Sequence, residues 1–162
     1  MDTVRGRVIV DSGASSSMAG LEWLEDVQTR LMDEYGHDWM EVDASYATML
    51  TFANGETSTS LGKITVPMFL GGVSGKLKFV GVDKPGPALL GMDYMQHMGW
   101  CVDFETGRCV IKELKQDFVL PRLPNGHLYV DIFDHSRIGA VSASATVQAV
   151  ALPLGDLVKD KE

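Results

Sequence analysis

An aspartate that directly follows a short hydrophobic strand is the most informative chemical feature of the sequence. Residues 8–10 are β-branched, and Asp11, Ser12 and Gly13 come immediately after them. A carboxylate buried without a partner costs several kcal/mol or becomes protonated, so an acidic residue at this place has either a partner or a task. The same residues also fit a simple Asx turn in which Asp11 only ends the strand. This segment alone leaves both interpretations open.

Two further segments contain residue types that fit beside such an aspartate. Residues 88–91 are hydrophobic and end in glycine, and Asp93 follows at the start of a short predicted helix. Between these two segments, Asn54 and Gly55 are the strongest two-residue hairpin signal in the chain. The chain therefore contains a strand and turn, then a hairpin, then a strand and helix, in that order.

In this order and spacing, the three segments resemble the retropepsin-like aspartic proteases. The matching residues are 11–14, 52–56 and 89–95. A hairpin predicted at 101–111 also resembles the closing hairpin of retrotransposon proteases and of their cellular ubiquitin-shuttle relatives. The resemblance covers residues 3–115. It implies an all-β fold, namely a closed acid-protease barrel with a short C-terminal helix and an inserted helix.

The resemblance further implies an aspartic endopeptidase that cleaves extended peptides, including segments of a polyprotein to which it belongs. Such enzymes activate a water molecule between two carboxylates that share one proton. The sequence contains a single Asp-Ser-Gly motif, so the second aspartate must be Asp11 of another copy. The implied enzyme is a homodimer with a two-fold axis, and it needs no cofactor and no metal.

Roles for individual residues follow from the same resemblance. Asp11, Ser12 and Gly13 form the catalytic turn: Asp11 activates the water, Ser12 donates its hydroxyl across the dimer, and Gly13 lets the substrate backbone approach. The remaining assignments are Ala14 and the flap tip Ala53, Asn54 and Gly55 for substrate binding, with Leu89, Leu90 and Gly91 supporting the catalytic turn. We assign Asp93 to a structural hydrogen bond at the start of the helix rather than to catalysis.

Two departures from the family pattern affect the expected dimer. Only ten residues precede Asp11, so the N-terminal strand that many retroviral members use in their interface is missing or short. Ser15 stands where the family often has an acidic residue, which removes one ion pair between subunits. Dimerisation would then depend on the hairpin at 101–111 or on the helix at 20–35.

Several alternatives stay open at this stage. The glycine-rich segment 71–75 competes with 50–60 for the role of flap, although the chain order favours 50–60 because two further strands follow it before Leu89. A retropepsin-like dimerisation or peptide-binding module without turnover would keep the same fold. A structural β-domain in which Asp11 is only a turn residue is a third interpretation.

The elements that must position these residues are mostly short strands. Strands are predicted at 3–10, 46–52, 61–70, 77–82, 88–91, 101–104 and 108–111, with less regular ones at 118–120 and 128–133. Helices are predicted at 20–35 and 93–98, and the first has a hydrophobic stripe of Leu21, Leu24, Val27 and Leu31 and ends at Gly36. We expect one domain over residues 1–133, with its core at about 3–115, and a flexible tail or linker at 134–162.

The composition limits the partners and the cellular compartment that we expect for the domain. The 162 residues are 45% hydrophobic, and no run approaches the roughly 20 apolar residues of a membrane-spanning helix. The net charge is −8, and no cluster of Lys and Arg could neutralise phosphates, so we expect neither nucleic acid nor a membrane as a partner. The four histidines lack metal-ligand spacing, and Cys101 and Cys109 are too few for a disulfide framework. These features favour the cytoplasm or the interior of a virus-like particle.

Overall fold

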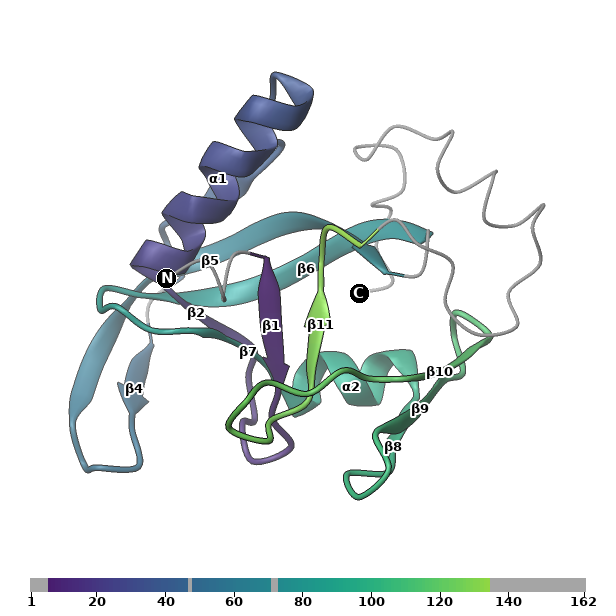
Figure 1. Ribbon diagram of the computed structural model, residues 1–162. Coiled ribbons are helices and arrows are strands. Elements are labelled where there is room, and N and C mark those ends of the chain that lie inside the picture. The colour runs from purple at the N-terminus through teal and green to yellow at the C-terminus, as the bar shows by residue number, and fades with distance from the viewer. Residues whose placement is uncertain (1–5, 47, 71–72, 135–162) are drawn as a thin grey trace.

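The structure is a computed structural model that describes residues 6–46, 48–70 and 73–134, and these residues form a mostly β fold with two helices (Figure 1). Apart from Asp134, the predicted tail at 134–162 lies outside the described residues. The elements in chain order are β1 (Arg7–Val10), β2 (Met18–Gly20), α1 (Leu21–Tyr35), β3 (Glu41–Asp43), β4 (Met49–Thr51), β5 (Thr57–Leu70), β6 (Val73–Val82), β7 (Ala88–Leu90), α2 (Met92–Met98), β8 (Trp100–Val102), β9 (Arg108–Ile111), β10 (Gln116–Val119) and β11 (Tyr129–Asp131).

Eight strands form the main sheet, in the order β11-β1-β7-β2-β6-β5-β3, with β4 paired to β5. Strand β1 lies between β7, to which it is parallel, and β11, to which it is antiparallel. At the far side of the sheet, β5 meets the end of the β11 segment at one isolated bridge between Phe69 and Phe133. The described strands therefore form a sheet whose two sides touch at this bridge, which by itself does not establish the closed barrel expected from the sequence.

The hairpin of β5 and β6 is the longest in the described structure, and its two ends lie in different parts of the fold. Its ladder runs from Ser60 opposite Val82 to Leu70 opposite Val73. A bulge separates Ser60 from Gly62, which has φ +128 and no room for a side chain against the carbonyl of Asp43. Beyond this bulge, the first residues of β5 pair with β4 instead. The bulge thus divides the β4–β5 hairpin from the main sheet.

The competing glycine-rich segment 71–75 is described only in part, because residues 71–72 lie outside the described residues. Residues 73–75 begin β6 and pair with the last residues of β5. Since β5 has 14 residues that each advance about 3.3 Å, its ends are roughly 40 Å apart along the strand. The last residues of β5 lie beside Phe133, and Ile132 donates to the carbonyl of Gly6, before the start of β1. Asp11 follows the other end of β1, so residues 73–75 do not lie beside it.

Helix α1 confirms the predicted helix at 20–35, but its buried face is rotated from the predicted one. Leu21 is 37% exposed, while Trp23 is buried at 3%. The Trp23 indole packs edge-on against Phe79 and donates to the carbonyl of Arg7 at 3.0 Å. The helix ends at Gly36, which has φ +72 and donates to the carbonyl of Met32. The buried face consists of Trp23, Leu24, Val27 and Leu31.

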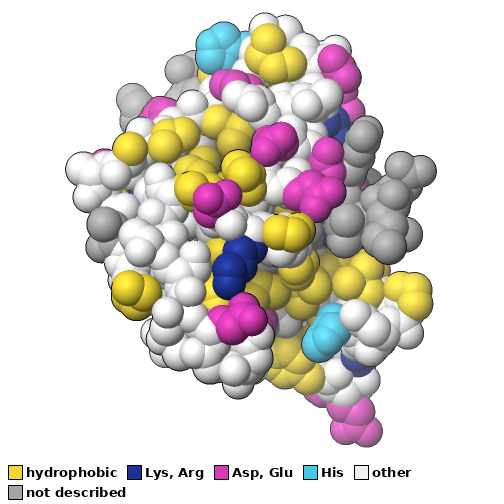
Figure 2. All heavy atoms as spheres, turned by 90° about the vertical axis from the view of Figure 1, so that its left-hand side faces the viewer, with side chains coloured by type: hydrophobic (Ala, Val, Ile, Leu, Met, Phe, Trp, Pro, Cys, Tyr) yellow, Lys and Arg dark blue, Asp and Glu magenta, His cyan; other side chains and the backbone are white. Residues whose placement is uncertain are grey.

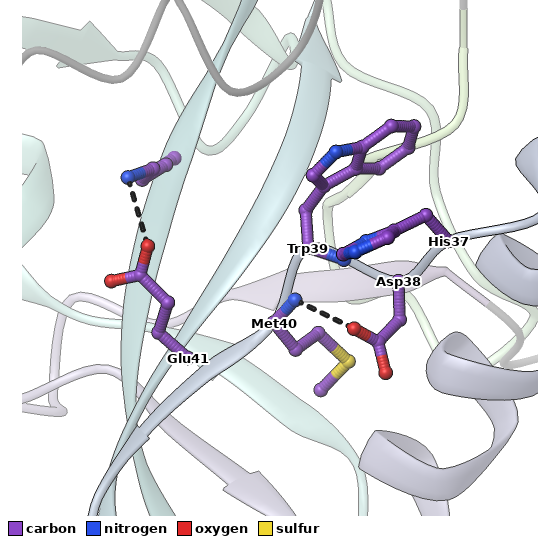
Figure 3. Close-up of polar contacts among 6 residues, drawn as sticks. His37, Asp38, Trp39, Met40 and Glu41 are labelled. Atoms are coloured by element: carbon purple, nitrogen blue, oxygen red, sulfur yellow. Dashed lines mark hydrogen bonds and ion pairs between the residues drawn. The ribbon is translucent and has the colours of Figure 1, made fainter.

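The segment between α1 and β3 is fixed by two carboxylates (Figure 3). Asp38 accepts the backbone N–H of Met40 at 3.0 Å and the side-chain amide of Gln28 at 2.8 Å, and the bond from Gln28 is the main reason why the pKa of Asp38 lies below its usual value. Glu41 pairs with Lys76 at 3.5 Å, which joins β3 to β6. This segment thereby connects the helix to the far edge of the sheet.

The described residues after 115 include further strands and part of the core. Strand β10 completes a separate three-stranded sheet, in the order β10-β9-β8, and β11 completes the main sheet beside β1. The core therefore extends beyond the predicted limit of about 115 to Phe133, which is 5% exposed. On the second sheet Cys109 is buried and Cys101 is exposed, and both are free thiols. Burial raises the pKa of the Cys109 thiol to about 12, so it is not a nucleophile.

Candidate functional site

The turn after β1 presents the Asp11 carboxylate at the end of a central strand. Asp11 is partly exposed, and Ser12 and Gly13 are exposed. The backbone N–H of Gly13 donates to Asp11 Oδ1 at 2.9 Å, and the N–H of Ala14 donates to the carbonyl of Asp11 at 3.2 Å. A side chain at residue 13 would begin 3.2 Å from the same carboxylate oxygen. These bonds form the Asx turn that was one interpretation of the sequence, and they orient a carboxylate that solvent reaches.

Strand β7 and the start of α2 support this turn from one side. Leu89 lies opposite Ile9 in the parallel ladder, and Leu90 accepts the backbone N–H of Asp11 at 3.0 Å. Gly91 passes directly against the chain at Ser16, where a Cβ atom on residue 91 would lie 2.6 Å from the carbonyl carbon. Only glycine allows this approach without displacing the turn. Residues 89–91 therefore lie in contact with this turn.

Ser17 and Asp93 link the turn to helix α2. Ser17 is 1% exposed, and its hydroxyl donates to Asp93 Oδ1 at 2.9 Å while it accepts the backbone N–H of Gly91, also at 2.9 Å. The backbone N–H of Ser17 donates to both carboxylate oxygens of Asp93 at 3.0 and 3.1 Å. The structural role predicted for Asp93 is confirmed. Ser17 was not predicted, because within the run 15–17 nothing in the sequence distinguishes the one buried serine.

The opposite side of the turn is supported by the segment that leads into β11. Val10 donates its backbone N–H to the carbonyl of Leu128 at 2.9 Å, next to Asp11. Leu128 is 2% exposed and anchors this contact in the core. The turn is therefore held between two segments that lie about 80 and 115 residues further along the chain. The sequence gives no local signal for the pairing with Leu128.

Ala14 takes a position that differs from the other predicted substrate-binding residues. Its side chain is only 8% exposed, and its carbonyl accepts the backbone N–H of Met92 at 2.8 Å. Ala14 therefore packs the turn onto the start of α2. In this single chain its side chain faces the interior rather than an open surface.

The predicted flap is the β4–β5 hairpin, and its tip is exposed. Ala53, Asn54 and Gly55 are all exposed, and Gly55 has φ +85. The Asn54 side chain accepts the backbone N–H of Glu56 at 3.0 Å, while Gly55 donates to the carbonyl of Phe52 at 2.9 Å. Figure 1 shows this hairpin and the turn at residues 11–17 at the same, lower end of the molecule. The predicted hairpin is therefore present, with a glycine where the turn needs positive φ.

The structure brings some predicted site residues together and leaves others apart. The catalytic turn and its support are in contact through hydrogen bonds, as described above. Within the described residues, the polar contacts of the hairpin tip reach the loop at 83–87 and not the Asp11 turn. Figure 2, viewed from the side on which this hairpin lies, shows hydrophobic side chains at the surface. Two hydrophobic residues before and within β4, Tyr46 and Met49, are 36% and 64% exposed.

The described part of the chain contains neither a cluster of metal-ligand residues nor a membrane-spanning helix. No group of three or more His, Cys, Asp or Glu side chains gathers there as a set of metal ligands. In the same residues, neither helix has the length and apolar character needed to cross a lipid bilayer.

Comparison with known proteins gives likenesses among solved structures alone. No protein-family model matches the sequence, and no curated protein matches it. Among solved structures, the chain is similar to the retroviral protease-like domain of Ddi1 from Leishmania major, with 19% sequence identity and a TM-score of 0.45. The match covers 67% of this chain and 86% of that domain. Neither value assigns the chain to a family or an activity, so the function is inferred from the geometry of the site.

Proposed function

We propose that the protein is an aspartic endopeptidase of the retropepsin type, active as a homodimer whose Asp11 residues face each other across a two-fold axis. The observation that carries this proposal is the Asp11 turn itself. A carboxylate accessible to solvent stands at the end of a central strand, and hydrogen bonds from β7, α2 and the segment before β11 fix the turn from both sides. A residue that only ended a strand would not need this degree of support.

The chemistry requires the two carboxyl groups to share one proton. Two adjacent carboxylates repel each other, so one stays protonated while the other is ionised at the same pH. The ionised Asp11 accepts a proton from water, and the water oxygen adds to the carbonyl carbon of the substrate. The protonated carboxyl, from Asp11 of the partner subunit, donates its proton to the carbonyl oxygen. Asp11, which now carries the water proton, donates it to the amide nitrogen, and the ionised Asp11 of the partner subunit takes a proton from a hydroxyl of the tetrahedral diol. The C–N bond then breaks, which leaves a carboxylic acid and an amine and restores the shared proton.

The other predicted residues have roles in this proposal that depend on the dimer. Ser12 is exposed beside Asp11, where its hydroxyl can reach the second copy. Gly13 offers its carbonyl to the backbone of an extended peptide, and Ala53, Asn54 and Gly55 cover that peptide from the other side. An extended substrate would lie between the turn and the hairpin as an added strand. We also propose that the sheet closes into a barrel beside the space between the turn and the hairpin.

The hairpin of β8 and β9 is the surface that we propose for the dimer. The inner face of α1 is buried in its own protomer, and its remaining surface is acidic, so two such helices would repel each other. In contrast, Phe104 in the β8–β9 turn is 46% exposed. Arg122 donates to the carbonyl of Phe104 at 2.6 Å and to that of Gly126 at 3.1 Å, which joins this turn to the segment beside Asp11. A contact made here would be continuous with the catalytic turn.

Replacement of Asp11 by asparagine tests the activity. Wild-type protein and Asp11→Asn are incubated at high concentration, at about pH 5, with a peptide library and with an extended precursor, and the products are identified by intact mass. We expect cleavage by wild type and a loss of at least about a thousandfold in the variant, because an amide cannot accept the water proton. Asp83→Asn, in an exposed loop, is the matched control.

Two outcomes would contradict the proposal. Equal cleavage by both proteins would show that Asp11 is not the catalytic group. Silence of wild type at every concentration, with saturable binding of the same peptides, would instead identify a peptide-binding module without turnover.

A further inference from the structure

Lys84 makes two contacts with the hairpin that we assign as the flap. Its ammonium nitrogen lies 3.1 Å from Glu56 Oε2 and 5.1 Å from the centre of the Phe52 ring. Phe52 and Glu56 stand on the two sides of the hairpin turn, and Phe52 donates its backbone N–H to the carbonyl of Glu56 at 2.9 Å. One side chain from outside the hairpin thus touches both of its arms at the base of the tip.

The backbone of Lys84 is bonded to the start of helix α1. Its carbonyl accepts the backbone N–H of Leu21, the first residue of α1, at 3.2 Å. Gly20 packs so closely against this loop that an added Cβ atom would lie 2.8 Å from the same carbonyl and 2.6 Å from that of Gly86. Both partners belong to the junction of β2 and α1 in the core. The Lys84 side chain therefore extends from a fixed point.

In the described structure, Lys84 reaches the hairpin from a different segment, whereas Lys63, whose ammonium lies 5.1 Å from the centre of the Tyr46 ring, belongs to β5 itself. The ladder between β5 and β6 ends at Ser60 and Val82, and residues before Ser60 pair only with β4. The bulge at Gly62 further separates the hairpin from the sheet. A two-stranded hairpin is only marginally stable by itself in water. The position of the hairpin therefore depends on contacts outside the ladder, and Lys84 supplies one of them, the ion pair with Glu56.

We propose that Lys84 is a positioning residue that holds the β4–β5 hairpin in place through Glu56 and Phe52 and so sets how well the hairpin covers a bound peptide. The effect on the hairpin follows from the contacts alone. Its effect on catalysis rests on the proposed protease function. Lys84 touches neither the substrate nor the reacting atoms, and it acts only through the hairpin.

The size of the effect follows from the two contacts. Lys84 and Glu56 are 40% and 62% exposed at their side chains, so solvent screens the ion pair. An exposed ion pair and an exposed cation–π contact together shift a local equilibrium by about three- to tenfold. We expect removal of the Lys84 charge to raise the open population of the hairpin by this factor while the fold stays intact.

Hydrogen exchange of the hairpin amides measures this population without any need for activity. Lys84→Gln should speed exchange at Phe52 and Gly55 by about three- to tenfold, and Glu56→Gln should speed it less, because that variant keeps the contact between Lys84 and Phe52. The double exchange Lys84→Glu with Glu56→Lys should return the rates toward wild type, because it restores an ion pair of opposite polarity. Lys76→Gln is the matched control, since Lys76 forms an ion pair of similar kind with Glu41 on the same sheet (Figure 3).

Unchanged exchange at 49–57 in Lys84→Gln, or an equal change in Lys76→Gln, would overturn the proposal. Peptide kinetics then test the catalytic consequence separately. For an active wild type, Lys84→Gln should raise KM by about threefold or more and leave kcat nearly unchanged, because the cost of ordering the hairpin appears in substrate binding. An unchanged KM would overturn that consequence. A wild type that cleaves nothing would refute the protease, while the exchange rates still decide the role of Lys84.

Discussion

Asp11 obtains its geometry from residues that are distant in the sequence. Its backbone N–H bonds to Leu90, its side chain accepts the N–H of Gly13, and the preceding residue bonds to Leu128. The polar centre of this support is Ser17, whose hydroxyl is both a donor and an acceptor in a buried position. Because a buried donor without a partner costs more than the bond itself contributes, Ser17 is a sensitive position.

Replacement of Ser17 by alanine should therefore destabilise the fold. The change removes the acceptor of the Gly91 N–H, which stays buried, and one donor to Asp93. We expect a loss of about 1–3 kcal/mol in the free energy of unfolding, measured by denaturant titration. Ser15→Ala, at an exposed neighbouring position, should change the stability by less than about 0.5 kcal/mol. Equal stability of Ser17→Ala and wild type would mean that this network does not support the turn.

At the scale of elements, β11 is the strand that completes the sheet beside β1. It carries a carboxylate at Asp131 that is about half buried and accepts the backbone N–H of Phe133 at 2.9 Å. Burial raises the pKa of Asp131 above its usual value. Asp134 adds to this rise, whereas the Phe133 N–H, Arg30 and Arg7 oppose it. The folded chain therefore favours the neutral form of this carboxyl more than the unfolded chain does.

This shift predicts a pH dependence of stability. A raised pKa of an acid contributes stability that is complete below the unfolded pKa and is lost as the pH rises through the folded pKa. Asp131→Asn cannot ionise, and its amide oxygen can still accept the Phe133 N–H. Relative to wild type, the variant should gain unfolding free energy as the pH rises from about 4 to about 7, because only the wild type must then hold an ionised carboxylate in this half-buried position. Thermal unfolding at both pH values measures this, and a constant difference would contradict it.

Elements with local signals could be predicted from the sequence, and those defined by distant partners could not. The glycines at 36 and 55 and the hydrophobic run 88–90 predict the end of α1, the hairpin and β7. The predicted buried face of α1 was wrong at one position, because it contained Leu21 where the structure buries Trp23. Both residues are apolar, and only the packing against Phe79 selects Trp23. The place of β11 depends on pairing across more than 110 residues, for which a single sequence holds no signal.

The same distinction applies to the candidate site. The Asp-Ser-Gly turn and Gly91 could be predicted from residue type and order. Ser17 and Lys84 could not, because serine runs and surface lysines are common and only the three-dimensional contacts give these two a role. Side chains whose function lies in a contact with another element are not visible in a local pattern.

At the scale of the whole molecule, charge works against the dimer that the proposed function requires. Each chain has a net charge of −8, so two copies repel each other at neutral pH. Salt shortens the range of this repulsion, from a Debye length of about 30 Å at 0.01 M to about 8 Å at 0.15 M. Protonation of carboxyl groups at acid pH lowers it as well. We therefore expect the dimer to be favoured by salt and by mildly acidic conditions.

Specific activity as a function of protein concentration tests the central claim most directly, because the claim places half of the catalytic pair on each of two chains. Peptide cleavage by wild type is measured at about pH 5 over a wide range of dilution, at low and at raised salt. In the dilute range, specific activity should rise in proportion to protein concentration, and raised salt should move the curve to lower concentrations. A specific activity that is the same at every concentration would contradict an active site built from two copies of Asp11.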